Sequence, residues 1–170
     1  MIVIKTDDEI DAMRAAGDVS AQILDAVGSL VKPGTNTQQI NEFVHDMTLE
    51  LGAKPAPLNY KGFPKSVCTS VNDVICHGIP STKQKLREGD IINIDVTSIV
   101  DGYHGDTSRM YTVGKVSDKA QKLVRVAQEC LFYGILKIED GARVGDIGSA
   151  IQTHAEKHGY SVVREFVGHG

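Results

Sequence analysis

The chain has 170 residues, 41% of them hydrophobic and 24% charged, and its formal net charge is −4. This composition indicates a globular protein with enough chain for one core or two fused halves. The acidic balance, without any run of Lys or Arg, argues against a nucleic-acid-binding surface. No stretch approaches the roughly 18 apolar residues of a membrane span, and the acidic start does not look like a signal peptide.

The three cysteines, Cys68, Cys76 and Cys130, are an odd number without CxxC spacing. They therefore indicate neither a disulfide framework nor a thiolate zinc site. Because unpaired thiols persist in a reducing compartment, we expect a cytoplasmic protein. A secreted protein with a single bridge is the alternative, and the redox argument disfavours it.

The first third of the chain carries two helix-start patterns. Thr6 and Glu9 form a capping box, which predicts a helix that continues until residues 32–34. A second box, Thr35 to Gln38, predicts another helix, whose apolar face consists of Ile40, Phe43, Val44, Met47 and Leu51. Gly52 ends this helix. The next residues, 53–65, contain three prolines and a glycine and predict a loop.

The middle of the chain changes to the two-residue period of strands. Residues 66–71 and 74–76 predict short strands, and residues 91–97 and 107–113 predict longer ones. Asp101-Gly102 is a strong hairpin signal between the two longer strands.

The last third returns to helices. The pattern predicts one helix from 117 to about 138 and another from about 144 to 158, ended by Gly159. Residues 161–167 then predict a last strand.

An internal repeat relates the two helical regions. A shift of 107 residues places four positions on similar ones: Gly34 on Gly141, Ile40 on Ile147, Val44 on Ile151 and Gly52 on Gly159. Chance alignment of two helical pairs is the alternative, because helical periodicity is common. If the repeat is real, residues 1–170 are one incomplete domain, with a first pseudo-repeat at about 5–113 and the start of a second at about 114–170. The sheet of the second copy would lie beyond residue 170.

Two aspartates lie on the predicted hairpin. If Asp101-Gly102 form the turn, Asp106 pairs with Thr97 and Asp95 pairs with Ser108, provided that no bulge disturbs the register. Both carboxylates then project from one face, about 7–8 Å apart at most.

Such a carboxylate pair in an apolar strand needs neutralising, because an unpaired buried charge costs several kcal/mol. Bound cations would supply this. The alternatives are an ion pair of Asp95 with Arg109 or Lys115, or a solvent-exposed face, and the hairpin alone slightly favours these alternatives.

Two histidines favour cations. His77 precedes Gly78 at the end of a predicted strand, and His169 lies between two glycines, so neither is typical of a packed core. A mobile loop histidine is the alternative for each. Imidazole together with carboxylates suits Zn, Fe, Co or Mn better than Ca or Mg. Three such ligands would leave positions open for a water.

Four segments together resemble bacterial type I methionine aminopeptidases of peptidase family M24. Residues 64–80 (PKSVCTSVNDVICHGIP) resemble the stretch around that family's substrate-facing histidine. Residues 89–96 (GDIINIDV) and 102–108 (GYHGDTS) resemble its two aspartate segments, and residues 162–170 (VVREFVGHG) resemble the segment of its histidine ligand. The resemblance runs from Ile4 to the last residue with all spacings in order.

The resemblance implies an α+β "pita-bread" fold, as in the creatinases and aminopeptidases, with an antiparallel sheet and covering helices. The chain would hold the N-terminal half and the helical part of the second pseudo-repeat. Asp95 would bind one metal ion, Asp106 would bridge both, and His169 would bind the other. His77 would be the catalytic, substrate-facing histidine.

The resemblance also implies further binding residues. Tyr60, Phe63 and Cys68 would line the pocket for a methionine side chain, although loop packing explains them equally well. Backbone carbonyls of Asn72 and Val74 would bind a monovalent cation, Na⁺ or K⁺. Lys61 departs from many relatives, which carry a histidine there, so a contact at the pocket rim is in doubt.

The implied activity is metal-dependent removal of the N-terminal methionine from nascent proteins whose second residue is small. It would use two divalent ions (Co, Mn, Fe or Zn) in the cytoplasm, in proximity to the ribosome. The partners would be peptides with an N-terminal methionine, with no nucleic acid and no membrane.

The family needs two glutamates and another histidine after the Gly-His-Gly segment. We therefore expect a C-terminally truncated chain, weak or inactive alone, with a missing C-terminal fragment or a second copy as partner. The alternative is a non-catalytic peptide-binding or structural fragment. Of the other residues, His45, His154 and His158 are expected at the surface, His104 in a structural role in the hairpin and Cys130 in the core.

Overall fold

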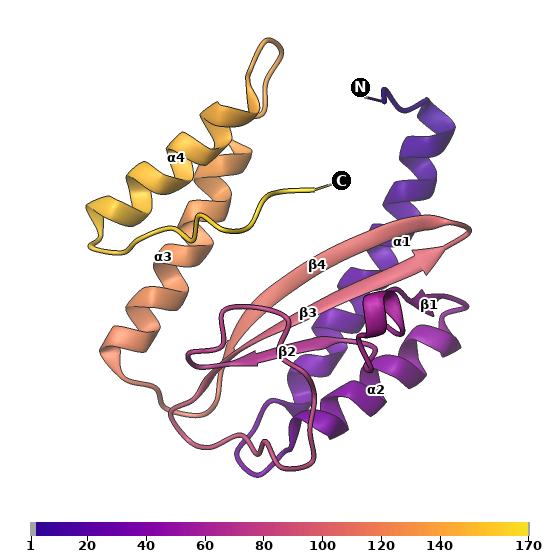
Figure 1. Cartoon of the computed structure of the whole chain (residues 1–170), viewed down its shortest axis with the longest axis vertical. Coiled ribbons are helices and arrows are strands. Elements are labelled where there is room, and N and C mark those ends of the chain that lie inside the picture. Colours follow the sequence, from indigo (N-terminus) through magenta and orange to yellow (C-terminus); the bar gives the residue numbers. More distant parts are fainter. Residues whose placement is uncertain (1–2, 170) are drawn as a thin grey trace. The chain divides into compact units, whose positions relative to one another are not determined.

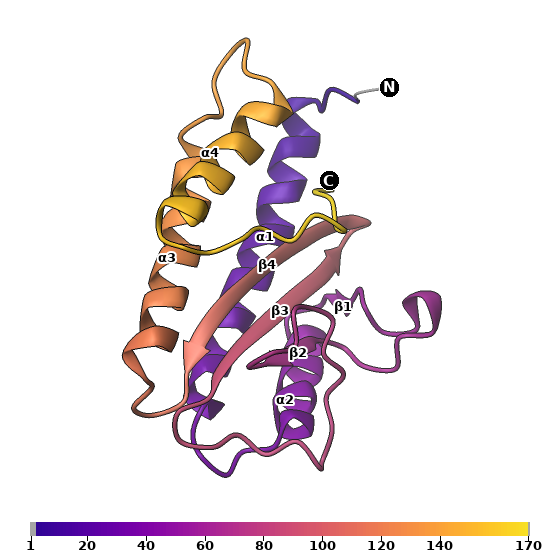
Figure 2. The ribbon, with the colours of Figure 1, turned by 60° about the vertical axis from the view of Figure 1, so that its left-hand side comes forward.

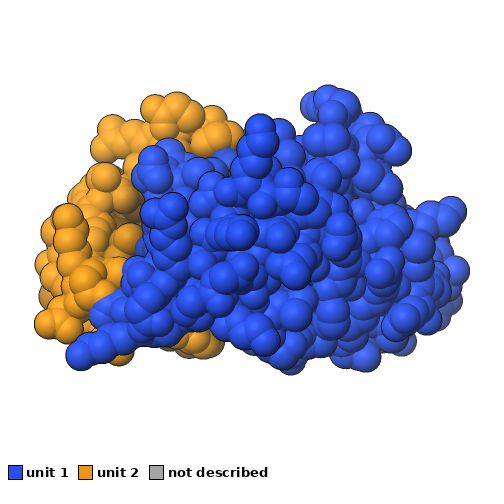
Figure 3. All heavy atoms as spheres, turned by 90° about the horizontal axis from the view of Figure 1, so that it is seen from below, with its two compact units in different colours: residues 1–116 blue, residues 117–170 orange. Residues whose placement is uncertain are grey.

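A computed structural model describes residues 3–169 of the chain. The chain forms two compact units, Met1–Val116 and Ser117–Gly170, which Figure 3 colours separately. The boundary lies close to the predicted start of the second pseudo-repeat, and the symmetry between the repeats stays a prediction.

The first unit is an antiparallel sheet covered by two helices. The helices are α1 (Asp7–Val27) and α2 (Thr37–Glu50), and the strands are β1 (Lys54–Pro55), β2 (Cys68–Val71), β3 (Ile91–Val100) and β4 (Tyr103–Thr112). β3 is central, because β4 pairs along its length while β2 and β1 pair with successive stretches of it. Figures 1 and 2 both show α1 and α2 on the same face of the sheet.

The core of this unit lies between the sheet and its helices. Alternate residues of β3, Ile92, Ile94 and Val96, are almost completely buried. They pack with buried side chains of α1 and α2: Ile23, Leu24, Val27, Ile40 and Val44. Burial of each such side chain stabilises the fold by about 1.5–3 kcal/mol. The intervening residues of β3 consequently point to the other face of the sheet.

The helix ends agree with the sequence only in part. The capping box of Thr6 and Glu9 at α1 is confirmed. However, α1 ends at Val27, before a 3₁₀ turn (Gly28–Leu30), because glycine weakens a helix and Ser29 Oγ donates to the carbonyl of Ala26 at 2.9 Å.

The second capping box begins one residue later than predicted. Asn36 and Gln39 form it, not Thr35 and Gln38. Thr35 is excluded from the helix because its carbonyl accepts from the N–H of Leu86 at 2.8 Å. Leu51, predicted on the apolar face, is 37% exposed because it follows the last helical turn.

The predicted strand at 74–76 is wrong. Asn72 and His77 have left-handed backbones, with φ of 53° and 55°, so the chain turns at both ends of this stretch. The N–H of Val74 donates back to the carbonyl of Val71 at 3.1 Å, which is a turn contact and not a ladder contact. A short 3₁₀ turn (Tyr60–Gly62) and β1 also interrupt the predicted loop at 53–65.

The second unit is a helical hairpin of α3 (Asp118–Ile135) and α4 (Val144–Lys157). Ser117 caps α3, and Gly159, with φ of 83°, follows the end of α4 as predicted. Its small core contains the buried residues Val126, Cys130 and Ala155, with Ile151 and Tyr160 against them. The burial of Cys130 agrees with its predicted place in the core.

The predicted strand at 161–167 is also wrong, since these residues are exposed and form no ladder with any residue in the described range 3–169. A strand satisfies its N–H and C=O groups through a neighbouring strand, so an alternating pattern without such a neighbour leaves irregular chain. None of the helices within residues 3–169 is long and apolar enough to span a membrane.

At Gly105 the backbones of α1 and β4 approach each other closely, and this contact can be tested. Ser20 Oγ donates to the Gly105 carbonyl at 2.7 Å. A Cβ at Gly105 would lie 2.1 Å from the carbonyl oxygen of Ala16. Because backbone cannot yield cheaply, Gly105→Ala should lower the free energy of unfolding by about 3 kcal/mol or more, measured by urea denaturation.

Gly17→Ala is the matched control, because a Cβ there meets nothing within 4 Å. Since alanine is the better helix former, this variant should be as stable as the wild type or up to about 1 kcal/mol more stable. Equal stability of the two variants would contradict the close approach of α1 to β4.

Candidate metal centre

The hairpin of β3 and β4 places Asp95 and Asp106 as the sequence predicted. Asp95 pairs with Ser108 and Thr97 pairs with Asp106, in a ladder that continues without a bulge from Ile91 to Val100. The turn residues Asp101 and Gly102 both have positive φ, 48° and 87°, as a tight two-residue hairpin requires. Asp95 and Asp106 are therefore diagonal neighbours on one face of the sheet.

This face is opposite the one that α1 and α2 cover. Asn93, Asp95 and Thr97 alternate with the buried apolar residues of β3 and are only partly buried. Thr97 Oγ1 donates to Asp106 Oδ1 at 3.1 Å, which fixes the orientation of that carboxylate. The polar residues of the hairpin thus gather on one side while the core lies on the other.

Arg109, one of the two side chains considered as an ion-pair partner for Asp95, belongs to the other face. It pairs with Ile94 in the ladder. Its guanidinium bonds to Asp25 Oδ1 of α1 at 2.6 Å, and this hydrogen bond raises the pKa of Arg109. The register therefore separates Arg109 from Asp95. For Lys115, the other candidate, the backbone N–H donates to Glu88 Oε1 at 2.5 Å, and an ion pair of its side chain with Asp95 stays a prediction.

Cys68 lies next to the two aspartates. It pairs with Asp95 across β2 and β3, so both side chains lie on the same face. Burial raises the pKa of the Cys68 thiol to about 12, with further contributions from Asp95, Cys76 and Asp106. Cys68 therefore stays a neutral thiol near pH 7, in a region where the carboxylates concentrate negative charge. Such a region favours a cation.

His77 is fixed at the outer edge of β2. The neighbouring Gly78 accepts from the N–H of Thr69 at 2.8 Å and donates to Ser70 Oγ at 3.2 Å. A Cβ at Gly78 would lie 2.1 Å from the carbonyl oxygen of Thr69, so only glycine permits this approach. His77 is exposed and has φ of 55°, and it lies beside the strand that carries Cys68.

The residues predicted for a monovalent cation lie in a turn after β2. Asn72 is held by its side chain, because Nδ2 donates to Asp90 Oδ1 at 2.8 Å and Oδ1 accepts from the N–H of Ile91 at 3.0 Å. Asn72, Val74 and Gly78 line a shallow pocket. The cation-binding role of Asn72 and Val74 stays a prediction.

The predicted pocket residues lie on the connection from β1 to β2 and at the start of β2. Tyr60 is 64% exposed, with Lys61 Nζ 5.3 Å from its ring centroid. Phe63 is half-buried and Cys68 is buried. The turn at Tyr60 separates it from β2, so a shared methionine pocket stays a prediction.

His169 belongs to the second unit, in the exposed irregular segment after α4. Its meeting with Asp95 and Asp106 in one metal centre stays a prediction. Gly170, the last residue of the predicted Gly-His-Gly segment, lies outside the described residues.

His45 and His154, both expected at the surface, are partly buried, whereas His104, expected in a structural role in the hairpin, is exposed. His45 is half-buried and its Nδ1 lies 2.8 Å from Ser66 Oγ. His104 is exposed on β4. The side chain of His154 on α4 is only 14% exposed, and its Nε2 lies 2.8 Å from Glu129 Oε2 on α3.

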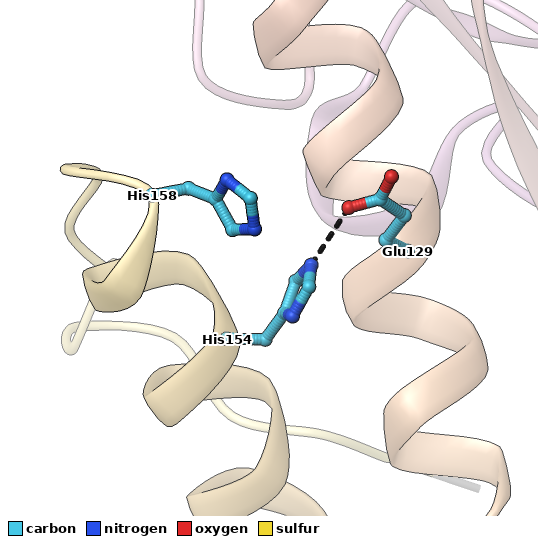
Figure 4. Close-up of side chains that lie close together, drawn as sticks. All are labelled: Glu129, His154 and His158. Atoms are coloured by element: carbon cyan, nitrogen blue, oxygen red, sulfur yellow. Dashed lines mark hydrogen bonds and ion pairs between the residues drawn. The ribbon is translucent and has the colours of Figure 1, made fainter.

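Glu129, His154 and His158 form a cluster that the sequence interpretation missed. One ligand atom from each lies within 4.8 Å of the others, and Figure 4 shows His158 on the same helix face as His154. Hydrogen bonds from His154 and Arg125 lower the pKa of Glu129, and burial, followed by the charge of His154, lowers the pKa of His158. The spacing of the two histidines, four residues apart on a helix, was the available signal.

Comparison with known proteins identifies the family. The sequence model of "Metallopeptidase family M24" matches residues 11–170. "Methionine aminopeptidase A" of Synechocystis sp. is 56% identical over 162 residues, which cover 95% of this chain and 64% of that protein. "Methionine aminopeptidase" of Rickettsia prowazekii is 53% identical over 169 residues, which cover 99% of this chain and 65% of that protein.

The fold agrees with these sequence matches. The crystal structure of methionine aminopeptidase from Rickettsia prowazekii superposes with a TM-score of 0.98 at 52% identity, over 100% of this chain and 68% of that one. The sheet and its helices are thus those of the pita-bread fold, as the sequence predicted. The chain spans 64–65% of the length of the two relatives named above. The chain belongs to metallopeptidase family M24, in which it is similar to the methionine aminopeptidases.

Proposed function

We propose that this chain carries metal- and substrate-binding residues of an enzyme that removes the N-terminal methionine from nascent proteins whose second residue is small. The observation that carries the proposal is the register of the hairpin, which directs Asp95 and Asp106 to the same face of the sheet. The proposed reaction is that of the methionine aminopeptidases, to which the chain is 53–56% identical.

The donor set suits a pair of divalent transition-metal ions. Two carboxylates with one imidazole are ligands for Co, Mn, Fe or Zn. Asp95 would hold one ion, Asp106 would bridge, and His169 would hold the other. When bound, such ions lower the pKa of a water and polarise the scissile carbonyl. Asn72 and Val74 would hold a Na⁺ or K⁺ ion through their backbone carbonyls.

The side chains of the chain itself would orient the substrate. His77, held beside β2 by Gly78, would donate a hydrogen bond to the peptide group under attack and stabilise the charge that develops there. Cys68, Tyr60 and Phe63 would surround the methionine side chain. A neutral thiol at Cys68 presents a soft, weakly polar surface, and this suits contact with a thioether.

The surroundings of the reaction follow from the same family role. The substrates would be nascent chains that leave the ribosome in the cytoplasm. Free thiols at Cys68, Cys76 and Cys130 support a reducing compartment. The 170 residues contain three of the side chains that the family resemblance assigns to the metal ions, so we expect this polypeptide alone to be weakly active or inactive.

The influence of the two aspartates on Cys68 gives a test of the charge at this face. In metal-free buffer with a chelator, Asp95→Asn and Asp106→Asn should each lower the pKa of Cys68, because a thiolate forms more readily when a nearby negative charge is removed. A fall of one pKa unit raises the thiolate fraction about tenfold. Mass spectrometry of alkylated peptides at pH 8–9 should therefore show faster modification of Cys68.

Asp101→Asn is the matched control, since it removes an aspartate from the turn of the same hairpin and asparagine suits that turn. Cys68 should react in this variant as in the wild type. An equal rate of Cys68 alkylation in the variants of Asp95, Asp106 and Asp101 would contradict the placement of both carboxylates beside Cys68.

The proposed activity can be tested in a chimera. This chain would replace the matching N-terminal part of the Rickettsia prowazekii methionine aminopeptidase, which is 53% identical to it. The chimera should release methionine from a Met-Ala-Ser peptide when supplied with Co²⁺ or Mn²⁺. Asp106→Ala should abolish release, and His77→Ala should lower kcat about 10²–10³-fold through loss of one donor.

His104→Gln serves as the control, because His104 is exposed on β4 and has no part in the proposed metal or substrate binding. It should leave kcat unchanged. An active chimera whose kcat is the same with His77→Ala would remove His77 from the proposed mechanism. A folded chimera without any metal-dependent release would refute the function.

A further inference from the structure

We propose that Glu129, His154 and His158 form a second metal site, which binds one late transition-metal ion such as Zn²⁺ between α3 and α4. These residues share no member with the candidate centre of Asp95, Asp106 and His169. Two imidazoles and a carboxylate are a donor set that Zn²⁺, Ni²⁺ and Cu²⁺ prefer. The ion would fasten the two helices of the second unit to each other.

The geometry is already close to that of a coordination shell. Ligand atoms about 2.0–2.1 Å from a zinc ion lie about 3.3 Å apart at the edge of a tetrahedron. Glu129 Oε2 and His154 Nε2 are 2.8 Å apart, so a small separation would admit the ion in place of the shared proton. One ligand atom from each of the three residues lies within 4.8 Å of the others, so side-chain adjustments of about 1–2 Å would bring them to tetrahedral spacing.

The neighbouring side chains hold these ligands in position. The ring of Tyr133 lies 4.4 Å from that of His154, and the His154 and His158 rings are 4.6 Å apart, centroid to centroid. Arg125 Nη1 bonds to Glu129 Oε1 at 2.5 Å, which leaves Oε2 directed at His154. Figure 4 shows the carboxylate and both rings facing the space between the helices. Such support reduces the ordering that binding would otherwise require.

The position on α4 also favours a cation. His154 lies in the last turn and His158 is the C-cap residue, where unpaired carbonyls give the helix end a partial negative charge. Arg125 opposes an ion by charge repulsion, and so does Lys122, whose Nζ donates to the His158 carbonyl at 3.1 Å. The carboxylate of Glu129 offsets the charge of Arg125 directly, and the partial negative charge of the helix end offsets part of the charge of Lys122.

A bound metal ion would add stability to this unit, because its hydrophobic core is small. Only Val126, Cys130 and Ala155 form its buried cluster within the described part of the chain, with two partly buried residues against them. An ion that binds only the folded hairpin stabilises it in proportion to the logarithm of its concentration. Two imidazoles and one carboxylate would bind a single divalent ion that prefers nitrogen ligands. Because this ion would join α3 to α4, its role would be structural.

Zinc binding to the full chain tests this proposal. The candidate centre is silenced first with Asp95→Asn and Asp106→Asn together, and Zn²⁺ bound after dialysis is counted by elemental analysis. We expect one equivalent of Zn²⁺ in this background. His154→Gln or His158→Gln should remove it or raise its Kd more than tenfold, whereas His104→Gln, which removes an imidazole elsewhere, should not.

Thermal unfolding supplies the second readout. Zn²⁺ should raise the Tm of the chain that carries Asp95→Asn and Asp106→Asn, and should not do so after His158→Gln is added. If the silenced chain does not fold, as judged by circular dichroism, the wild type, His158→Gln and His104→Gln are compared instead, and His158→Gln alone should lose one equivalent. Equal zinc content with and without His158 would overturn the site.

Discussion

The candidate metal centre depends on one constraint, the register of the β3–β4 hairpin. Side chains alternate between the two faces of a strand, so a slip of one residue would exchange the buried isoleucines with the aspartates. Two features hold the register. The turn at Asp101 and Gly102 accepts positive φ at both positions, and Ile92, Ile94 and Val96 are buried only when they face the helices. Core packing and carboxylate placement are thus set together.

Glycine at position 105 ties this register to the helices. Ser20 of α1 bonds to the Gly105 carbonyl, and the next residue is Asp106. A shift of β4 would break this hydrogen bond and would bring a larger side chain against the backbone of α1. The same contact that closes the core therefore also positions a carboxylate on the opposite face. Gly78 does the equivalent for His77 beside β2, through its close approach to Thr69.

The sequence predicted features that local physics decides. The capping box at Thr6, the hairpin turn and the pairing of Asp95 with Ser108 each depend on a few neighbouring residues, and each is confirmed. Features that depend on distant partners were missed. The stretch at 161–167 has a strand-like pattern but no neighbouring strand within residues 3–169. The helix start was displaced to Asn36 because the carbonyl of Thr35 accepts from the N–H of Leu86, a residue far along the chain.

The cluster of Glu129, His154 and His158 shows why histidines considered one at a time did not predict this site. Each histidine alone resembles a surface residue, and the spacing of four residues becomes significant only when α3 brings Glu129 opposite it. The two proposed sites would also differ in selectivity. Asp95 and Asp106 supply hard oxygen ligands that accept Mn²⁺, whereas two imidazoles favour Zn²⁺ or Cu²⁺ by the ordinary order of affinities. Total metal content therefore cannot report on the candidate centre alone. An excess of zinc over manganese would reflect the helical hairpin as much as the aspartates, so the ligand chemistry of each unit has to be separated before a metal is assigned to the reaction.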